Sequence, residues 1–83
     1  MSKILVLAVA ELIKEMRHQR QLSQEKLADL ANLDRTYISG IERGLRNITL
    51  ESLESIISAL SISKSEFFFA LSLKLARGVN KDE

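Results

Sequence analysis

Arg35, Thr36 and Tyr37 place three hydrogen-bonding side chains in succession, ahead of the first apolar residue of their segment, Ile38. An arginine guanidinium can bond guanine through two donors, and a threonine can offer a methyl group to thymine or a hydroxyl to phosphate. Ser39 adds another small hydroxyl. Such a segment, at the exposed start of a helix, suits contact with the base edges and phosphates of DNA. The alternative is that these polar side chains only face solvent.

Arginines cluster locally just beyond this segment. Between residues 35 and 50 there are three arginines and one acidic residue, Glu42. Arg43, Arg46 and Asn47 belong to a region that would flank a DNA groove, although Arg43 could instead form a local ion pair and Asn47 could cap a turn. The whole chain has 12 basic and 11 acidic residues, so the case for a polyanionic partner depends on this local cluster.

Residue types typical of active sites are missing around these positions. His18 is the only histidine and there is no cysteine, which argues against a metal site. No serine has a histidine and an acid at a suitable spacing, and no glycine-rich phosphate loop occurs. We therefore expect a protein that is not an enzyme and needs no cofactor or metal. From its 83 residues we expect one domain, 1–83, and no small-molecule effector.

The apolar run at residues 4–10 is too short to span a bilayer, and the absence of cysteine suits a reducing compartment. We expect a cytoplasmic bacterial protein, associated with the nucleoid when bound to DNA, and no membrane partner.

Helical periodicity runs through the chain, which has no proline and only three glycines. It predicts an all-α fold, a bundle of five helices at about residues 3–19, 23–31, 34–43, 49–60 and 63–78, followed by a frayed tail at 79–83. Ser23, Asp34, Thr49 and Ser63 are the expected N-caps, the last in a capping box with Glu66. Residues expected to face the core in the first four helices are Leu5, Val9, Leu12, Ile13, Met16, Leu27, Ala28, Leu30, Ile38, Ile41, Leu50, Leu53, Ile56, Ile57 and Leu60.

The second and third expected helices are joined by a short turn at residues 32–34. This is the layout of a helix-turn-helix, here residues 23–44, whose second helix enters the major groove of DNA. Layout alone is weak support, because any small bundle contains tight helix pairs. The residue types at the start of the second helix strengthen the prediction of double-stranded DNA as the partner.

The last expected helix, 63–78, is too apolar for a monomer's surface. Its apolar residues form two stripes, one made of Phe67, Phe68, Leu71 and Leu75, the other of Phe69, Leu73 and Ala76. One stripe can cover the chain's own core and the other needs a further surface. We expect a two-fold homodimer through this helix, and the sequence does not determine which stripe faces the partner. The alternative is an antitoxin-like module that docks another protein there.

The stretch Leu22–Leu60 resembles the Cro/C1-type (XRE-like) helix-turn-helix regulators of bacteria and phages. The resemblance is carried by residues 22–24, 27–28, 38–39 and 41–44 and by the leucines of the helix that follows. Residues 32–43, with Arg46 and Asn47, most resemble controller proteins of restriction–modification systems. Such proteins are small homodimers with a lambda-repressor-like fold that regulate their own operon and the endonuclease gene. Because two recognition helices related by a two-fold axis would enter successive major grooves, we expect the operator to be a pseudo-palindrome.

The resemblance also implies roles for individual residues. Gln24 would bond a phosphate, and Arg17 and Glu42 would form a structural ion pair that orients the recognition helix. The residues that would sit at the groove are Arg35, Thr36, Tyr37 and Ser39. Those that would lie near phosphates or a base edge are Arg43, Arg46 and Asn47. Gln21 departs from the family, which often has glycine there, so it must adopt a costly positive φ or change the turn.

Overall fold

The helices of this computed structural model begin and end within about two residues of their expected positions. They are α1 (Ile4–Gln19), α2 (Gln24–Ala31), α3 (Arg35–Glu42), α4 (Leu50–Ala59) and α5 (Lys64–Arg77). The structure describes residues 3–78, so the expected tail at 79–83 lies outside it. Within these residues no strand occurs, and the prediction of an all-α fold with five helices is confirmed.

Short polar side chains begin three of the helices. Ser23 Oγ accepts a hydrogen bond from the Lys26 amide at 2.9 Å, and Thr49 Oγ1 accepts one from the Ser52 amide at 3.0 Å. At α5 the capping box is complete, because Ser63 and Glu66 each bond the other's amide, at 3.0 and 3.1 Å. Asp34 precedes α3 in extended backbone but makes no side-chain cap bond, so only part of its predicted role is seen.

Left-handed residues end four helices. Asn32 (φ 57°) and Gly44 (φ 72°) follow α2 and α3, as their types suggest. Gln21, after α1, also has φ 57°, which is the costly conformation expected of a non-glycine residue there. Ser61, after α4, has φ 62°, a conformation that its residue type does not predict.

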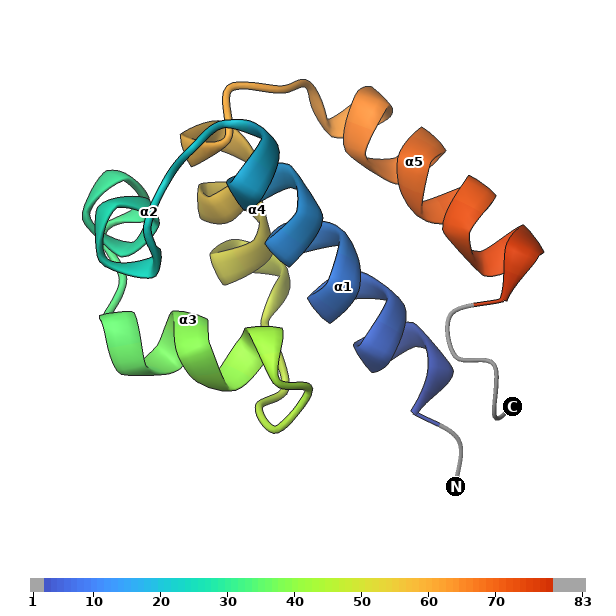
Figure 1. Cartoon of the computed structure of the whole chain (residues 1–83), viewed down its shortest axis with the longest axis horizontal. Helices are drawn as coiled ribbons and strands as arrows, with labels where there is room; N and C mark the ends of the chain where they lie inside the picture. Colours follow the sequence, from blue (N-terminus) through green and yellow to red (C-terminus); the bar gives the residue numbers. More distant parts are fainter. Residues whose placement is uncertain (1–2, 79–83) are drawn as a thin grey trace.

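Helix α1 lies at the centre of the bundle, with α3 and α5 on opposite sides of it in Figure 1. Helix α2 packs against α3 and α4, which places the helix-turn-helix pair on the side of α1 away from α5 (Figure 1). Side chains from all five helices meet in one core, whose largest fully buried members are Ile13, Leu27, Ile38, Ile56, Leu60 and Phe67. Burial of this shared core fixes where α3 can sit.

Three predicted core residues are wrong. Leu5, Leu30 and Leu50 are 59, 51 and 82% exposed. The inward side of α2 is defined by its buried residues Leu27, Ala28 and Ala31. Leu30 lies on the flank of the helix, and Ala31 is buried instead of it. Leu5 and Leu50 lie in the first turns of α1 and α4, at the rim of the bundle, where the neighbouring helices no longer cover them.

Membrane-spanning length is not reached by any one helix between residues 3 and 78. Only α4 and α5 taken together, with a 105° bend between them, satisfy the length and composition of a span.

Candidate nucleic-acid interface

The outward face of α3 carries four polar side chains. At 3.6 residues per turn, an arc of about 100° holds Arg35, Thr36, Ser39 and Arg43. Ser39 is half-buried and the other three are exposed. The opposite side of the helix carries Ile38 and Ile41, which are buried in the core. The apolar pair thus turns the predicted base-reading side chains, apart from Tyr37, away from the bundle.

Tyr37 lies outside this arc, on the flank of α3 that faces the α3–α4 loop. Its ring stacks beneath the Arg46 guanidinium, whose carbon is 5.1 Å from the ring centroid. Its hydroxyl donates to the Asn47 carbonyl oxygen at 3.4 Å. The structure therefore brings Tyr37, Arg46 and Asn47 together as a second polar cluster beside the first.

The positive charges of these two clusters are uncompensated. Within residues 3–78, Arg35, Arg43 and Arg46 form no ion pair, so the local pair considered for Arg43 is not made there. An exposed guanidinium without an acidic partner can bond a phosphate or a base edge without first breaking an ion pair.

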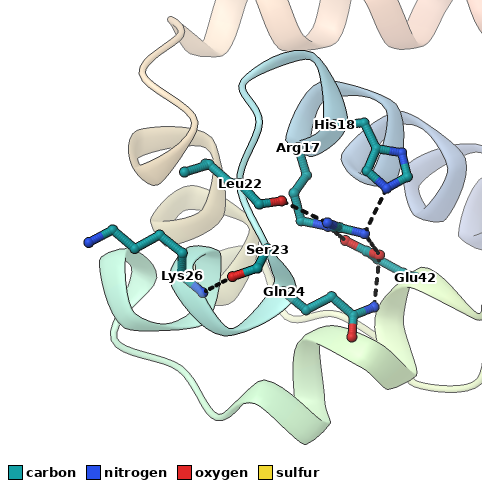
Figure 2. A network of polar contacts seen from close by, with 7 residues as sticks. All are labelled: Arg17, His18, Leu22, Ser23, Gln24, Lys26 and Glu42. Carbon is teal, nitrogen blue, oxygen red and sulfur yellow. Dashed lines mark hydrogen bonds and ion pairs between the residues drawn. The ribbon is translucent and has the colours of Figure 1, made fainter.

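A buried polar network joins α1, α2 and α3 behind the recognition face (Figure 2). Arg17 donates two hydrogen bonds to the Glu42 carboxylate, from Nε at 2.7 Å and from Nη2 at 2.9 Å, and its Nη1 donates to the Leu22 carbonyl at 2.8 Å. The two side chains are only 9 and 2% exposed. The structure thus contains the ion pair that the resemblance implied.

Gln24 extends this network from the start of α2. Its Nε2 donates to Glu42 Oε1 at 3.0 Å, as Figure 2 shows. His18 Nε2 lies 3.2 Å from Arg17 Nη2 on the other side. Every buried side-chain nitrogen and oxygen among the described residues has a partner. Because an amide nitrogen carries two hydrogens, the bond to Glu42 leaves one for the expected phosphate contact of Gln24.

The predicted dimer contacts on α5 divide into two groups. Phe67 and Leu71 are buried in the chain's own core, so they are not available to a partner, and this part of the prediction is wrong. The period of the helix puts them on the side that faces α1 and α4. The other four residues are exposed, and these are Phe68, Phe69, Leu73 and Leu75.

An apolar groove runs beside the exposed Phe68. It has a volume of about 370 Å³ and lies between the first turn of α1, the start of α4 and α5. Leu5 and Leu50, the two leucines wrongly expected in the core, line it together with Val6 and Phe68. Arg46 and Asn47 line the same groove, which therefore adjoins the second polar cluster.

Sequence reasoning missed two contributors to this surface. The contact of the Tyr37 ring with Arg46, nine positions away, is not indicated by residue type. His18, which the sequence shows only as the single histidine, lies against the buried ion pair. A helical wheel that compares residue 37 with residues 35, 36 and 39 would have separated Tyr37 from the others.

Comparison with known proteins gives concordant results. The profile of the helix-turn-helix family HTH_3 matches residues 13–67. The control protein C.MunI of Mycoplasma sp. is 47% identical over 57 residues, which are 68% of this chain and 77% of that protein. The control protein C.SmaI of Serratia marcescens is 39% identical over 70 residues, 84% of this chain and 83% of the relative.

Solved structures give the same result in three dimensions. The wild-type restriction–modification controller protein C.Esp1396I superposes with a TM-score of 0.87 at 45% identity, over 92% of this chain and 99% of that one. The same controller protein has also been solved as a tetramer with its natural 35-base-pair operator, and that structure too has a TM-score of 0.87.

Proposed function

We propose a function that starts from the family of this chain, which belongs to the helix-turn-helix DNA-binding regulators and, within them, to the restriction–modification controller proteins. The chain binds a pseudo-palindromic operator as a homodimer and regulates its own operon. The observation that carries this proposal is the outward arc of α3, where two unpaired arginines and two hydroxyls share one face. Relatives named as control proteins and as an immunity repressor favour this function over the antitoxin-like docking module.

Roles for the site residues follow from their positions. Arg35 and Thr36, in the first turn of α3, would contact base edges, with Ser39 beside them. Arg43 and Gln24 would hold phosphates on either side of the groove, and the cluster of Tyr37, Arg46 and Asn47 would reach a phosphate or a base edge beyond it. The buried network of Arg17 and Glu42 takes no part in contact and sets the angle of α3.

A homodimer through the apolar groove fits the same geometry. The groove adjoins the loop that follows α3, so a second copy seated on it would bring two recognition helices to the same side of the assembly. Helices about 34 Å apart would enter successive major grooves. The relative C.Esp1396I forms a tetramer on its operator, which supports self-association as the use of this surface. The proposal assigns the interface to Leu5, Leu50 and Phe68.

Selection of bound sequences from random DNA tests the function directly. We expect the purified chain to enrich a site with two-fold symmetry. Arg35→Ala should then cost about 1–3 kcal/mol on that site and flatten the preference for its bases. Arg77→Ala removes the same charge at the far end of α5 and serves as the matched control. A wild-type chain that enriches no sequence, or an Arg35→Ala variant with full preference, would contradict the proposal.

Sedimentation of charged variants tests the dimer. Leu50→Asp should yield a folded monomer with weakened operator binding, because Leu50 is exposed in the subunit and its loss disturbs no core. Phe69→Asp, on the other side of α5, should leave the dimer intact. The reverse result, with a monomeric Phe69→Asp and a dimeric Leu50→Asp, would move the interface to the other stripe.

A further inference from the structure

Gly40 leaves an opening in the side of α3 that the Arg46 side chain fills. A methyl group at position 40 would overlap Cγ of Arg46 and would lie 3.4 Å from its Cδ and 3.6 Å from its Cβ. The aliphatic stem of Arg46 therefore lies against the helix backbone, where every other residue type would block it.

The backbone of Gly40 does not itself require a glycine. Its φ is not in the left-handed region, unlike that of Gly44. A glycine inside a helix lowers helix stability relative to alanine, so position 40 is weaker than it needs to be on local grounds. What the glycine provides at this position is space.

Arg46, which occupies this space, is fixed both at its backbone and at its guanidinium. Its loop is closed onto α3 by the Leu45 amide, which donates to the Gly40 carbonyl at 2.9 Å. Its guanidinium lies over the Tyr37 ring, whose hydroxyl donates to the Asn47 carbonyl. Stem, guanidinium and loop are thus fixed relative to α3 before any ligand arrives.

We propose that Gly40 is a specificity-determining positioning residue, which admits the Arg46 stem across α3 and so presents the guanidinium to DNA in a single pose. The inference rests on the proposed function and extends it to a residue that cannot contact DNA through a side chain. An arginine ordered in advance loses less rotamer freedom on binding, so a fixed pose increases both affinity and the penalty for a wrong sequence.

A measurement without DNA tests the packing. Tyr37 is the only tyrosine, so nuclear Overhauser contacts between its ring and the Arg46 methylene protons can be assigned without ambiguity. We expect these contacts in the wild type and their loss in Gly40→Ala, while the helix content stays the same and the melting temperature does not fall. Contacts that persist in Gly40→Ala would overturn the proposal.

A double-mutant cycle on the selected operator tests the consequence. Gly40→Ala and Arg46→Ala should each weaken binding by about 5- to 150-fold, the range for one lost arginine contact. The double variant should bind no more weakly than Arg46→Ala alone, because the added methyl group then meets nothing. In the same titrations, Gly40→Ala should flatten base preference where Arg46→Ala does.

The outcomes separate the two proposals. If the wild type binds the operator and Gly40→Ala binds it equally well, only the proposed role of Gly40 is overturned. Additive losses in the double variant have the same consequence. A wild-type chain without sequence preference overturns the proposed function, and with it the specificity role, whatever the ring contacts of Tyr37 show.

Discussion

Helix α1 is attached to α3 and to α5 by ion pairs of opposite kinds. Toward α3, Arg17 and Glu42 form a two-pronged pair that is almost wholly buried. Toward α5, Lys74 contacts Glu15 at 2.9 Å and Glu11 at 3.4 Å, and those carboxylates are 54 and 45% exposed. The same chemistry therefore operates in two environments, one shielded from water and one in which the lysine is only 15% exposed but its carboxylates are open to water.

The difference explains how each functional helix is held. A buried pair gains little net stability, but any other placement of its partners leaves a charge unpaired, so it fixes orientation. A pair at the surface is exchanged readily for water and contributes about 0–1 kcal/mol. The recognition helix thus has a buried ion pair in addition to its buried Ile38 and Ile41, whereas α5 depends on the apolar contacts of Phe67 and Leu71.

Removal of one buried partner should have the largest effect. Glu42→Ala leaves the Arg17 guanidinium buried without its carboxylate, and we expect the free energy of unfolding to fall by about 3–5 kcal/mol. Urea unfolding at a fixed protein concentration measures it, since a dimer's stability depends on concentration. Glu15→Ala is the matched control on the open pair and should cost about 1 kcal/mol or less. Equal losses in the two variants would erase the distinction.

The double variant Arg17→Met with Glu42→Leu sharpens this comparison. It leaves no charge unpaired, so most of the lost stability should return. Operator binding should not return with it, if the pair serves to orient α3. Full operator affinity in this variant would show that apolar packing alone sets the helix.

The attachment of α5 should respond to its apolar contacts. Leu71→Ala removes a buried side chain and should cost about 2–5 kcal/mol in the free energy of unfolding. Leu73→Ala removes an exposed side chain two positions further along α5 and should cost far less, because no cavity forms. The same urea series measures both. A small loss for Leu71→Ala would mean that α5 is held chiefly by the Lys74 pair.

Local signals predicted the helices well and the contacts between them poorly. Serine and threonine caps marked where α2, α4 and α5 begin, because a cap bond joins residues only three positions apart. The partners Arg17 and Glu42 are 25 positions apart and were identified only through the family resemblance. Periodicity predicts which side of each helix is buried but not how far along the helix that burial extends. It therefore predicts Leu5 and Leu50 in the core, although both lie at the rim of the bundle.

The candidate site shows the same limit. The outward arc of α3 could be predicted because Ile38 and Ile41 turn it away from the core. The contact of Arg46 with Gly40 could not, since it exists only where the returning loop lays Arg46 across the helix.

The turn after Arg17 offers a smaller and stabilising change. Gln21 has φ 57° in a turn closed by the Leu22 amide, which donates to the Arg17 carbonyl at 3.1 Å. A glycine adopts this conformation without steric cost, so Gln21→Gly should raise the free energy of unfolding by about 0.5–1 kcal/mol. Thermal unfolding should then shift upward by about 2–8 °C. Asn32→Gly is the control and should gain less, because asparagine already tolerates φ 57°. A lower melting temperature for Gln21→Gly would mean that its side chain contributes more than its backbone costs.

The pair on α5 should give the smallest effect, and one that depends on pH. Burial acts to lower the pKa of Lys74, but the hydrogen bonds and charges of Glu15 and Glu11 outweigh it and raise the pKa above 10.5. Because the raised pKa belongs to the folded state, the contribution is complete below pH 10.5 and is lost as pH rises through the folded value. Because the partner carboxylates are half-exposed, the contribution of Lys74 to the free energy of unfolding should not exceed about 1 kcal/mol.

Urea unfolding of the wild type and of Lys74→Met should therefore differ at neutral pH and converge in strong alkali. About 1 M salt should reduce the neutral difference, because the open pair is screened, while the loss from Glu42→Ala remains. If the difference in the free energy of unfolding between the wild type and Lys74→Met changes with neither pH nor salt, Lys74 acts through its aliphatic stem. Both attachments of α1 would then depend on burial rather than on exposed charge.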